Sequence, residues 1–164
     1  MSDGRPPPTL DPVAPQRAAA DPTASVWVAA SAGTGKTKIL TDRVLNLMLA
    51  GTRPERILCL TFTKAAAAEM SSRITEQLAE WAIAGDDTLT SRLHALVGSP
   101  VAAEMLVCAR KLFAHVLDTP GGMKIQTIHA FCQSLLGRFP LEAGVAPHFA
   151  VVDDRDAAEL MRSA

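Results

Sequence analysis

The stretch Ala30-Ser-Ala-Gly-Thr-Gly-Lys-Thr37 decides the fold class of this 164-residue chain. It follows an apolar run, Ser25–Ala29, that predicts a short buried strand, and it leads into a segment, Lys36–Ala50, that predicts a helix. A strand, a glycine-bearing turn and a helix in this order are typical of a phosphate-binding loop. The sequence therefore predicts a P-loop nucleotide-binding domain.

The residue types of this loop suit ATP and Mg²⁺. Gly33 and Gly35 let the backbone curl so that its N–H groups face phosphate oxygens, and the start of the following helix adds positive potential. Lys36 brings a charge to the β- and γ-phosphates, and the Thr37 hydroxyl can ligate Mg²⁺. The usual pattern begins with glycine where this chain has Ala30, although the glycines of the turn are kept. The nucleotide-binding residues predicted here are Ala30, Ser31, Ala32, Gly33, Thr34, Gly35, Lys36, Thr37 and Lys38, with Lys36 and Thr37 as the catalytic pair.

Two further apolar runs, Arg56–Phe62 and Lys124–Ile128, predict buried strands on either side of a helical stretch. Strands that alternate with helices imply parallel pairing, so we expect an α/β fold. A long helix is predicted over Lys64–Ile83, and its apolar side chains recur at helical spacing. They form one stripe made of Met70, Ile74, Leu78 and Trp81.

Helices are also predicted over 88–97, 101–117 and 129–139, with another beginning near 154. The all-helical part between Asp86 and Asp118 predicts an insertion on one edge of the sheet. The chain then divides into a disordered Pro-rich lead-in (1–22), a P-loop core (23–85), the helical insertion (86–118), a continuation of the core (119–148) and the start of a second helical insertion (149–164).

The composition is that of a soluble globular chain, with 48% hydrophobic and 20% charged residues and a net charge of −1. A near-neutral chain has no overall field that attracts nucleic acid, so any DNA contact must be local. From Lys36 to Arg73 there are seven bases against three acids. The chain lacks an apolar signal core at its start, which predicts a cytoplasmic protein. We expect its three cysteines, Cys59, Cys108 and Cys132, to be buried thiols.

Three flanking segments narrow the class of P-loop protein, which the loop alone leaves open. They are Pro15-Gln-Arg-Ala-Ala-Ala20, Leu60–Ile74 and Gln126–Leu136, and with the loop they resemble the UvrD/Rep helicases of superfamily 1, most closely the AddA type. The resemblance implies a partial RecA-like domain of an ATP-dependent helicase. It also implies 3′-to-5′ unwinding on single-stranded DNA in double-strand-break repair, with an AddB-like partner subunit.

The same resemblance assigns roles to particular residues. Gln16 stands in the place of the family's adenine-reading glutamine, and a carboxamide has the donor and acceptor that adenine's edge requires. Phe62 can stack on a base. The remaining predicted DNA contacts are to the phosphate backbone and come from Thr61, Thr63, Lys64, Thr127 and His129. A structural role fits part of the second segment equally well, since a Thr N-cap followed by a packing face at Ala65–Ala68 also explains it.

The motor of such a helicase needs a further acidic motif, which holds Mg²⁺ and orients the attacking water. The run at 149–154 ends in two acids, but the resemblance implies that it introduces a helical insertion. We therefore expect a fragment with little ATP hydrolysis and no unwinding of its own. Two other interpretations stay open: a non-catalytic nucleotide-binding product, and a small P-loop kinase.

Overall fold

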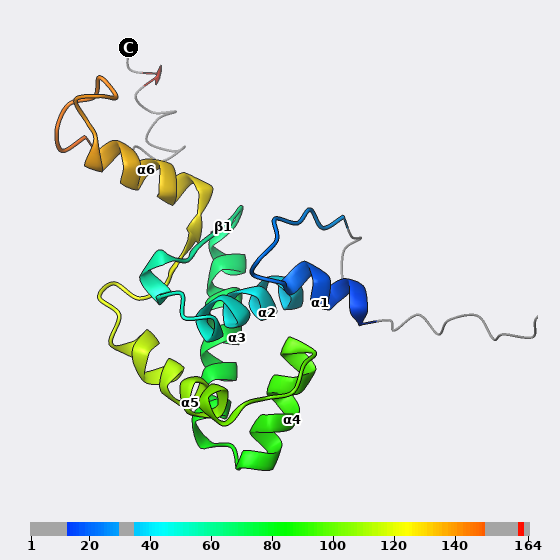
Figure 1. Ribbon diagram of the computed structural model, residues 1–164. Helices are drawn as coiled ribbons and strands as arrows, with labels where there is room; N and C mark the ends of the chain where they lie inside the picture. The colour runs from blue at the N-terminus through cyan, green and yellow to red at the C-terminus, as the bar shows by residue number, and fades with distance from the viewer. Residues whose placement is uncertain (1–12, 30–34, 150–160, 163–164) are drawn as a thin grey trace, which may run out of the picture.

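The computed structural model describes residues 13–29, 35–149 and 161–162 (Figure 1). Within them the chain forms, in order, α1 (Ala14–Ala20), α2 (Lys36–Leu49), a 3-10 turn (Pro54–Arg56), β1 (Leu58–Thr61), α3 (Lys64–Ile83), α4 (Asp86–Val97), α5 (Ala103–Leu117), β2 (Lys124–Thr127) and α6 (Ile128–Arg138). Every helix in this part of the chain is too short or too polar to cross a membrane.

The two strands lie side by side and run parallel, as the sequence predicts. Leu58 pairs with Lys124 at one end of the ladder and Thr61 pairs with Thr127 at the other. The three helices α3, α4 and α5 form the connection between the strands, which is the long crossover that parallel pairing requires. The α/β class is thereby confirmed, and the carboxyl ends of both strands meet at one edge of the sheet.

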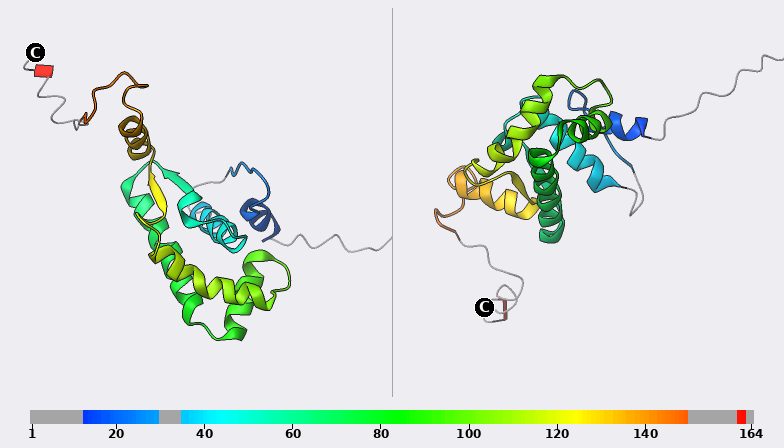
Figure 2. Two further views of the ribbon diagram at one scale, coloured as in Figure 1. Left: turned by 60° about the vertical axis from the view of Figure 1, so that its left-hand side comes forward. Right: turned by 90° about the horizontal axis from the view of Figure 1, so that it is seen from below.

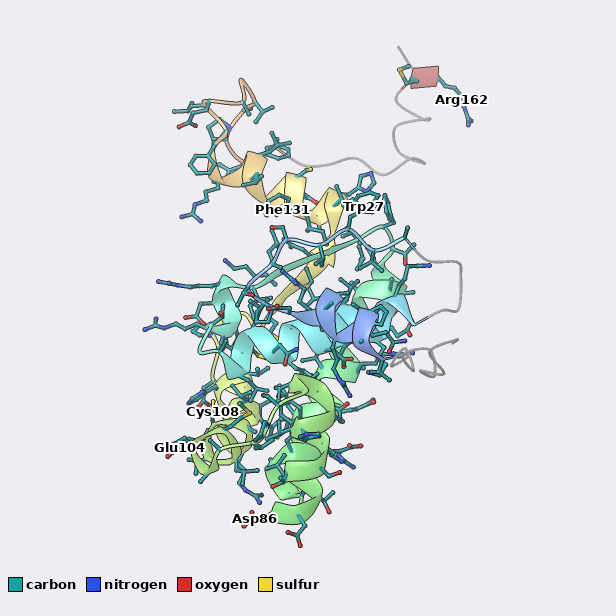
Figure 3. All side chains as sticks on the ribbon, turned by 45° about the vertical axis from the view of Figure 1, so that its right-hand side comes forward. Trp27, Asp86, Glu104, Cys108, Phe131 and Arg162 are labelled. Carbon is teal, nitrogen blue, oxygen red and sulfur yellow. The ribbon has the colours of Figure 1, made fainter. Side chains whose placement is uncertain are left out.

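The strand predicted over Ser25–Ala29 is wrong for this structure. The segment has no regular secondary structure and does not join β1 or β2, and Trp27 is 94% exposed (Figure 3). An apolar run favours burial, but a strand also needs a neighbour for its N–H and C=O groups. The two described strands pair only with each other, so Leu58 and Leu60 of β1 are also half exposed rather than buried.

The predicted disordered lead-in is wrong for its last part, because Ala14–Ala20 forms α1. Pro15 lies in the first turn, where its missing N–H costs nothing, and alanines follow it. Ala20 is buried where α1 packs on α2. Residues 1–12 lie outside the described part of the chain, as do 150–160 with the acidic run and the start of the last predicted helix.

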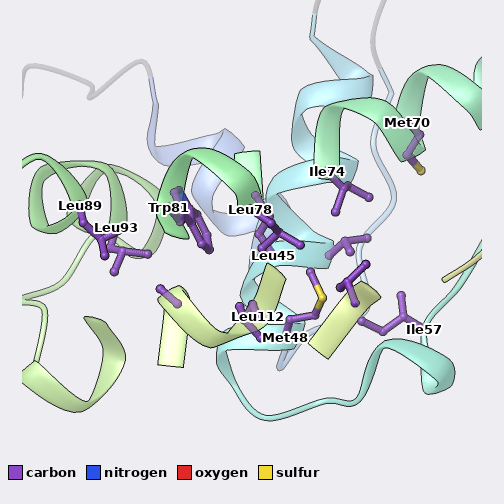
Figure 4. Packing of buried hydrophobic residues seen from close by; sticks show 13 residues of the cluster. Leu45, Met48, Ile57, Met70, Ile74, Leu78, Trp81, Leu89, Leu93 and Leu112 are labelled. Carbon is purple, nitrogen blue, oxygen red and sulfur yellow. The ribbon is translucent and has the colours of Figure 1, made fainter. Parts of the chain in front are cut away.

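The hydrophobic core lies between helices (Figure 4). The predicted stripe of α3 is confirmed, and it packs against Leu45 and Met48 of α2 and Leu112 of α5. The segment expected as an insertion on the sheet edge instead completes this core, since α5 packs along α3, and α4 adds Leu89 and Leu93. By contrast, α6 has no buried residue and extends away from the helical body in Figure 1 and in the left-hand view of Figure 2.

The thiols differ in exposure, which corrects the expectation that all three are buried. Cys132 on α6 is exposed, whereas Cys59 on β1 is partly covered by the core, and this burial raises its pKa. At about pH 8, near the usual thiol pKa of about 8.5, Cys59 therefore has less of the reactive thiolate.

We expect iodoacetamide to modify Cys132 first and Cys59 much later, as peptide mass spectrometry would show. In urea the two should react alike; equal rates in the folded chain would contradict the observed burial.

Candidate functional site

The helix α2 begins directly after the last glycine of the predicted phosphate loop. Gly35 precedes the helix in the left-handed region, with φ of 86°, a conformation that is strained for residues with a side chain. Its carbonyl accepts the N–H of Ile39, and the first N–H groups of any helix point outward without intrahelical partners. Lys36 is exposed and Thr37 is partly buried at this end. The predicted loop residues 30–34 lie outside the described part of the chain.

A pocket of about 460 Å³ lies between α1, the segment before the loop and the start of α2. Lys36 lines it together with Arg43, and the rest of its wall is mostly aliphatic, from Val26, Val28 and Leu40. This volume is within the range of small-molecule sites, about 300–1,000 Å³. The structure thus places Lys36 in the wall of a mostly apolar pocket.

Lys38 is separated from Lys36, although the sequence groups both with the nucleotide. Its Nζ donates to Asp42 Oδ2 at 2.5 Å, and both residues line a different pocket between α2, α3 and α4. Two positions along a helix differ by about 200°, so the two lysines face opposite sides of α2. Only the backbone N–H of Lys38 remains directed toward the beginning of the helix.

Gln16 is half-buried on α1, one turn before Ala19, which lines the pocket of Lys36. Its carboxamide is not part of that pocket wall. The structure brings the helix that carries Gln16 against the phosphate-loop helix, because α1 packs on α2. The chain after α1 turns at Asp21, whose carboxylate accepts hydrogen bonds from the Thr23 hydroxyl and N–H at 2.7 and 2.8 Å. These bonds lower the pKa of Asp21.

The predicted DNA contacts gather at the carboxyl edge of the sheet. Thr61 ends β1 and Thr127 ends β2, and these two residues pair. Phe62 follows β1 and is 84% exposed, so its ring can meet a base. Lys64 and His129, in the first turns of α3 and α6, are also exposed. Two segments far apart in sequence thus present the aromatic, cationic and imidazole groups together.

The threonines of this edge also form hydrogen bonds that stabilise the local structure. Thr63 and Thr127 cap α3 and α6, because their Oγ1 atoms accept the N–H groups of Ala66 and Ala130 at 3.1 Å. Thr61 donates its hydroxyl to the Thr63 carbonyl at 2.9 Å. A capping hydroxyl keeps its own O–H as a donor, which Thr63 presents on the surface, whereas Thr127 is buried, with 9% of its surface exposed. The packing face expected at Ala65–Ala68 is wrong except at Ala67, since the other three alanines are exposed.

Arg43 is the residue whose role the sequence left unassigned. In the sequence it is only one base in a basic stretch, but its guanidinium contacts three backbone carbonyls after α1 and lines the pocket of Lys36. Its spacing was a usable signal, since Lys36, Ile39, Leu40 and Arg43 recur on one face of a helix. Among the described residues no cluster of three His, Cys, Asp or Glu side chains could hold a metal ion.

Comparison with known proteins shows which protein family this chain matches. The profile of the UvrD/REP helicase N-terminal domain matches residues 13–164. Three AddA proteins, whose names describe one subunit of an ATP-dependent helicase/nuclease, are similar: from Lactobacillus helveticus (37% identity over 84% of the chain), Lactobacillus acidophilus (33% over 90%) and Desulforudis audaxviator (35% over 83%). The match covers 10% of each of these relatives, so the chain spans about a tenth of their length.

Proposed function

Since the chain belongs to the UvrD/Rep helicase family, we propose that it is the N-terminal ATP-binding part of an AddA-type DNA helicase. In this proposal β1 and β2 belong to a RecA-like sheet, and the complete protein moves 3′-to-5′ on single-stranded DNA during double-strand-break repair. An AddB-like subunit would be its partner. The match to proteins named as one subunit of an ATP-dependent helicase/nuclease supports the helicase activity and the existence of a partner subunit.

One observation carries the ATP-binding half of the proposal. Lys36 lies at the start of a helix that opens through a left-handed glycine, and it lines a pocket of about 460 Å³. The Lys36 ammonium is suited to bind the β- and γ-phosphates, while the helix N–H groups hold the remaining oxygens. The Thr37 hydroxyl would ligate the Mg²⁺ that accompanies ATP. Hydrolysis of the bound ATP supplies the energy for translocation.

The sheet edge would supply the DNA-binding half. We place the bases against Phe62 and the sugar–phosphate backbone against Lys64 and His129, with the hydroxyl of Thr63 as a further donor. These groups contact backbone and base faces rather than base edges, so binding should be insensitive to sequence. Cationic contacts to phosphates also make it weaken with added salt.

Substituting Phe62 by alanine tests this half. Loss of one stacked base is worth about 1–3 kcal/mol, so we expect the affinity for a fluorescent single-stranded oligonucleotide to fall about 5- to 150-fold. Fluorescence anisotropy measures it. Ile83→Ala is the matched control, because Ile83 is equally exposed, at 87%, but lies at the opposite end of α3. Equal losses in both variants would show that the oligonucleotide does not stack at the sheet edge.

A further inference from the structure

Side chains of the phosphate-loop helix hold the end of α1. Arg43 Nη1 donates to the carbonyl oxygens of Ala19 and Asp21 at 3.3 and 2.5 Å, and Nη2 donates to Ala24 O at 2.6 Å. One turn further along α2, Asn46 Nδ2 donates to Ala20 O at 3.2 Å. These four carbonyls cover the last residues of α1 and the turn after it.

Such bonds fix α1 more firmly than apolar contact alone. The last four carbonyls of a helix lack intrahelical partners, and Ala19 and Ala20 carry two of them. A guanidinium is a planar fork whose charged N–H groups form strong hydrogen bonds in set directions. Asn46 is buried, and a buried amide left without its partner is costly. The position of α1 relative to α2 is therefore set by directional bonds.

The turn after α1 brings backbone carbonyl oxygens within hydrogen-bonding distance of the Arg43 guanidinium. The Asp21 carboxylate binds the N–H and hydroxyl of Thr23, which folds the chain back on itself. The carbonyls of Asp21 and Ala24 consequently both lie within reach of Arg43. Because Arg43 also lines the pocket of Lys36, one side chain contacts both the pocket and the end of α1.

We propose that Arg43 and Asn46 are positioning residues for base selectivity. They hold α1 so that the Gln16 carboxamide meets the adenine of a nucleotide whose phosphates lie at Lys36. Gln16 lies one turn before the carbonyls that these two residues bind, so its distance from Lys36 depends on them. This proposal rests on the function proposed above, because it requires both the phosphate site at Lys36 and the adenine contact at Gln16.

The experiment separates base recognition from phosphate recognition. The full 164-residue chain and its variants are titrated with ATP, GTP and inorganic tripolyphosphate in the presence of Mg²⁺. A base-edge hydrogen-bond pair is worth about 1–3 kcal/mol, so we expect Gln16→Ala to lower the ATP-over-GTP preference by about five-fold or more. Arg43→Ala and Asn46→Ala should lower it similarly, and tripolyphosphate affinity should be retained in Asn46→Ala and in Arg43→Lys, which keeps the positive charge beside the pocket. Arg43→Lys, which keeps the charge and loses the fork, should fall between in the ATP-over-GTP preference.

Controls make the outcomes distinct. Arg53→Ala removes an exposed arginine whose ion-pair partner is Glu55, and it should change neither quantity. Lys36→Ala must weaken tripolyphosphate binding about 10-fold or more; if it does not, the proposed function fails and this inference with it. Two outcomes would overturn the inference alone, provided that tripolyphosphate binding depends on Lys36. In the first, Gln16→Ala keeps the preference for ATP over GTP. In the second, Gln16→Ala loses this preference but Arg43→Ala and Asn46→Ala keep it. A parallel loss of tripolyphosphate affinity in Arg43→Lys and Asn46→Ala would also overturn it, since it indicates a general structural role. Circular dichroism checks folding, and Arg43→Lys takes the place of Arg43→Ala if the alanine variant does not fold.

Discussion

Substituting Lys36 by alanine is expected to weaken ATP–Mg²⁺ binding about 10- to 150-fold. The variant loses a charge-assisted contact to phosphate, which is worth about 1.5–3 kcal/mol. The backbone N–H groups at the start of α2 remain, so some affinity should persist. Isothermal titration calorimetry with ATP and Mg²⁺ measures the change directly.

Lys38→Ala is the control for Lys36→Ala. It removes the same charge two residues away, but the Lys38 ammonium is bound to Asp42 on the other side of α2 and is 63% exposed. Its backbone N–H is unchanged by the substitution, so ATP affinity should stay close to that of the unsubstituted chain. An equal loss in both variants would mean that the phosphates respond to general positive charge, and that Lys36 has no specific site.

Substituting Trp81 by alanine is expected to lower the free energy of unfolding by about 3–5 kcal/mol. Trp81 of α3 is 2% exposed and belongs to the core cluster that α2, α3, α4 and α5 form. Its removal leaves a cavity that helices held together by many other contacts cannot fill. Urea denaturation followed by circular dichroism gives the value, and it is large against the total stability of a small domain, about 5–15 kcal/mol.

Trp81→Phe separates packing from hydrogen bonding at this position. The indole Nε1 has no hydrogen-bond partner among the described residues, so phenylalanine removes an unsatisfied donor while keeping most of the apolar volume. The expected cost is only about 1–2 kcal/mol. A cost as large as that of Trp81→Ala would show that the indole N–H makes a stabilising bond, for example to a buried water.

The parts of the fold that the sequence predicts well depend on local information. The bounds of α3 were predictable because Thr63 offers a capping hydroxyl and the apolar stripe repeats at helical spacing. The run at Ser25–Ala29 is equally apolar, yet it forms no strand here because strand formation depends on a neighbour elsewhere in the chain. The helix α1 was missed because proline-rich composition outweighed the fact that Pro15 is acceptable in a first turn.

Part of the candidate site could likewise be predicted from the sequence, and part of it could not. The roles proposed for Gly35, Lys36 and Thr37 follow from residue chemistry, and the opposite placement of Lys38 follows from the helical repeat. The bonds of Arg43 could not be predicted, because backbone carbonyls are present at every residue and leave no mark in the sequence. Only the packing of α1 on α2 determines which carbonyls a long side chain of α2 can reach.

The crossover between the strands has a consequence for how the molecule folds. The helices α3, α4 and α5 make contacts that are close in sequence, whereas β1 and β2 can pair only after the whole helical connection has closed. Closing a long loop costs chain entropy before the strand pairing can offset it. The edge that carries Phe62 and His129 thus depends on the pairing of strands that lie far apart in sequence, from Leu58 with Lys124 to Thr61 with Thr127. A substitution can therefore disturb that edge and leave the helical core intact.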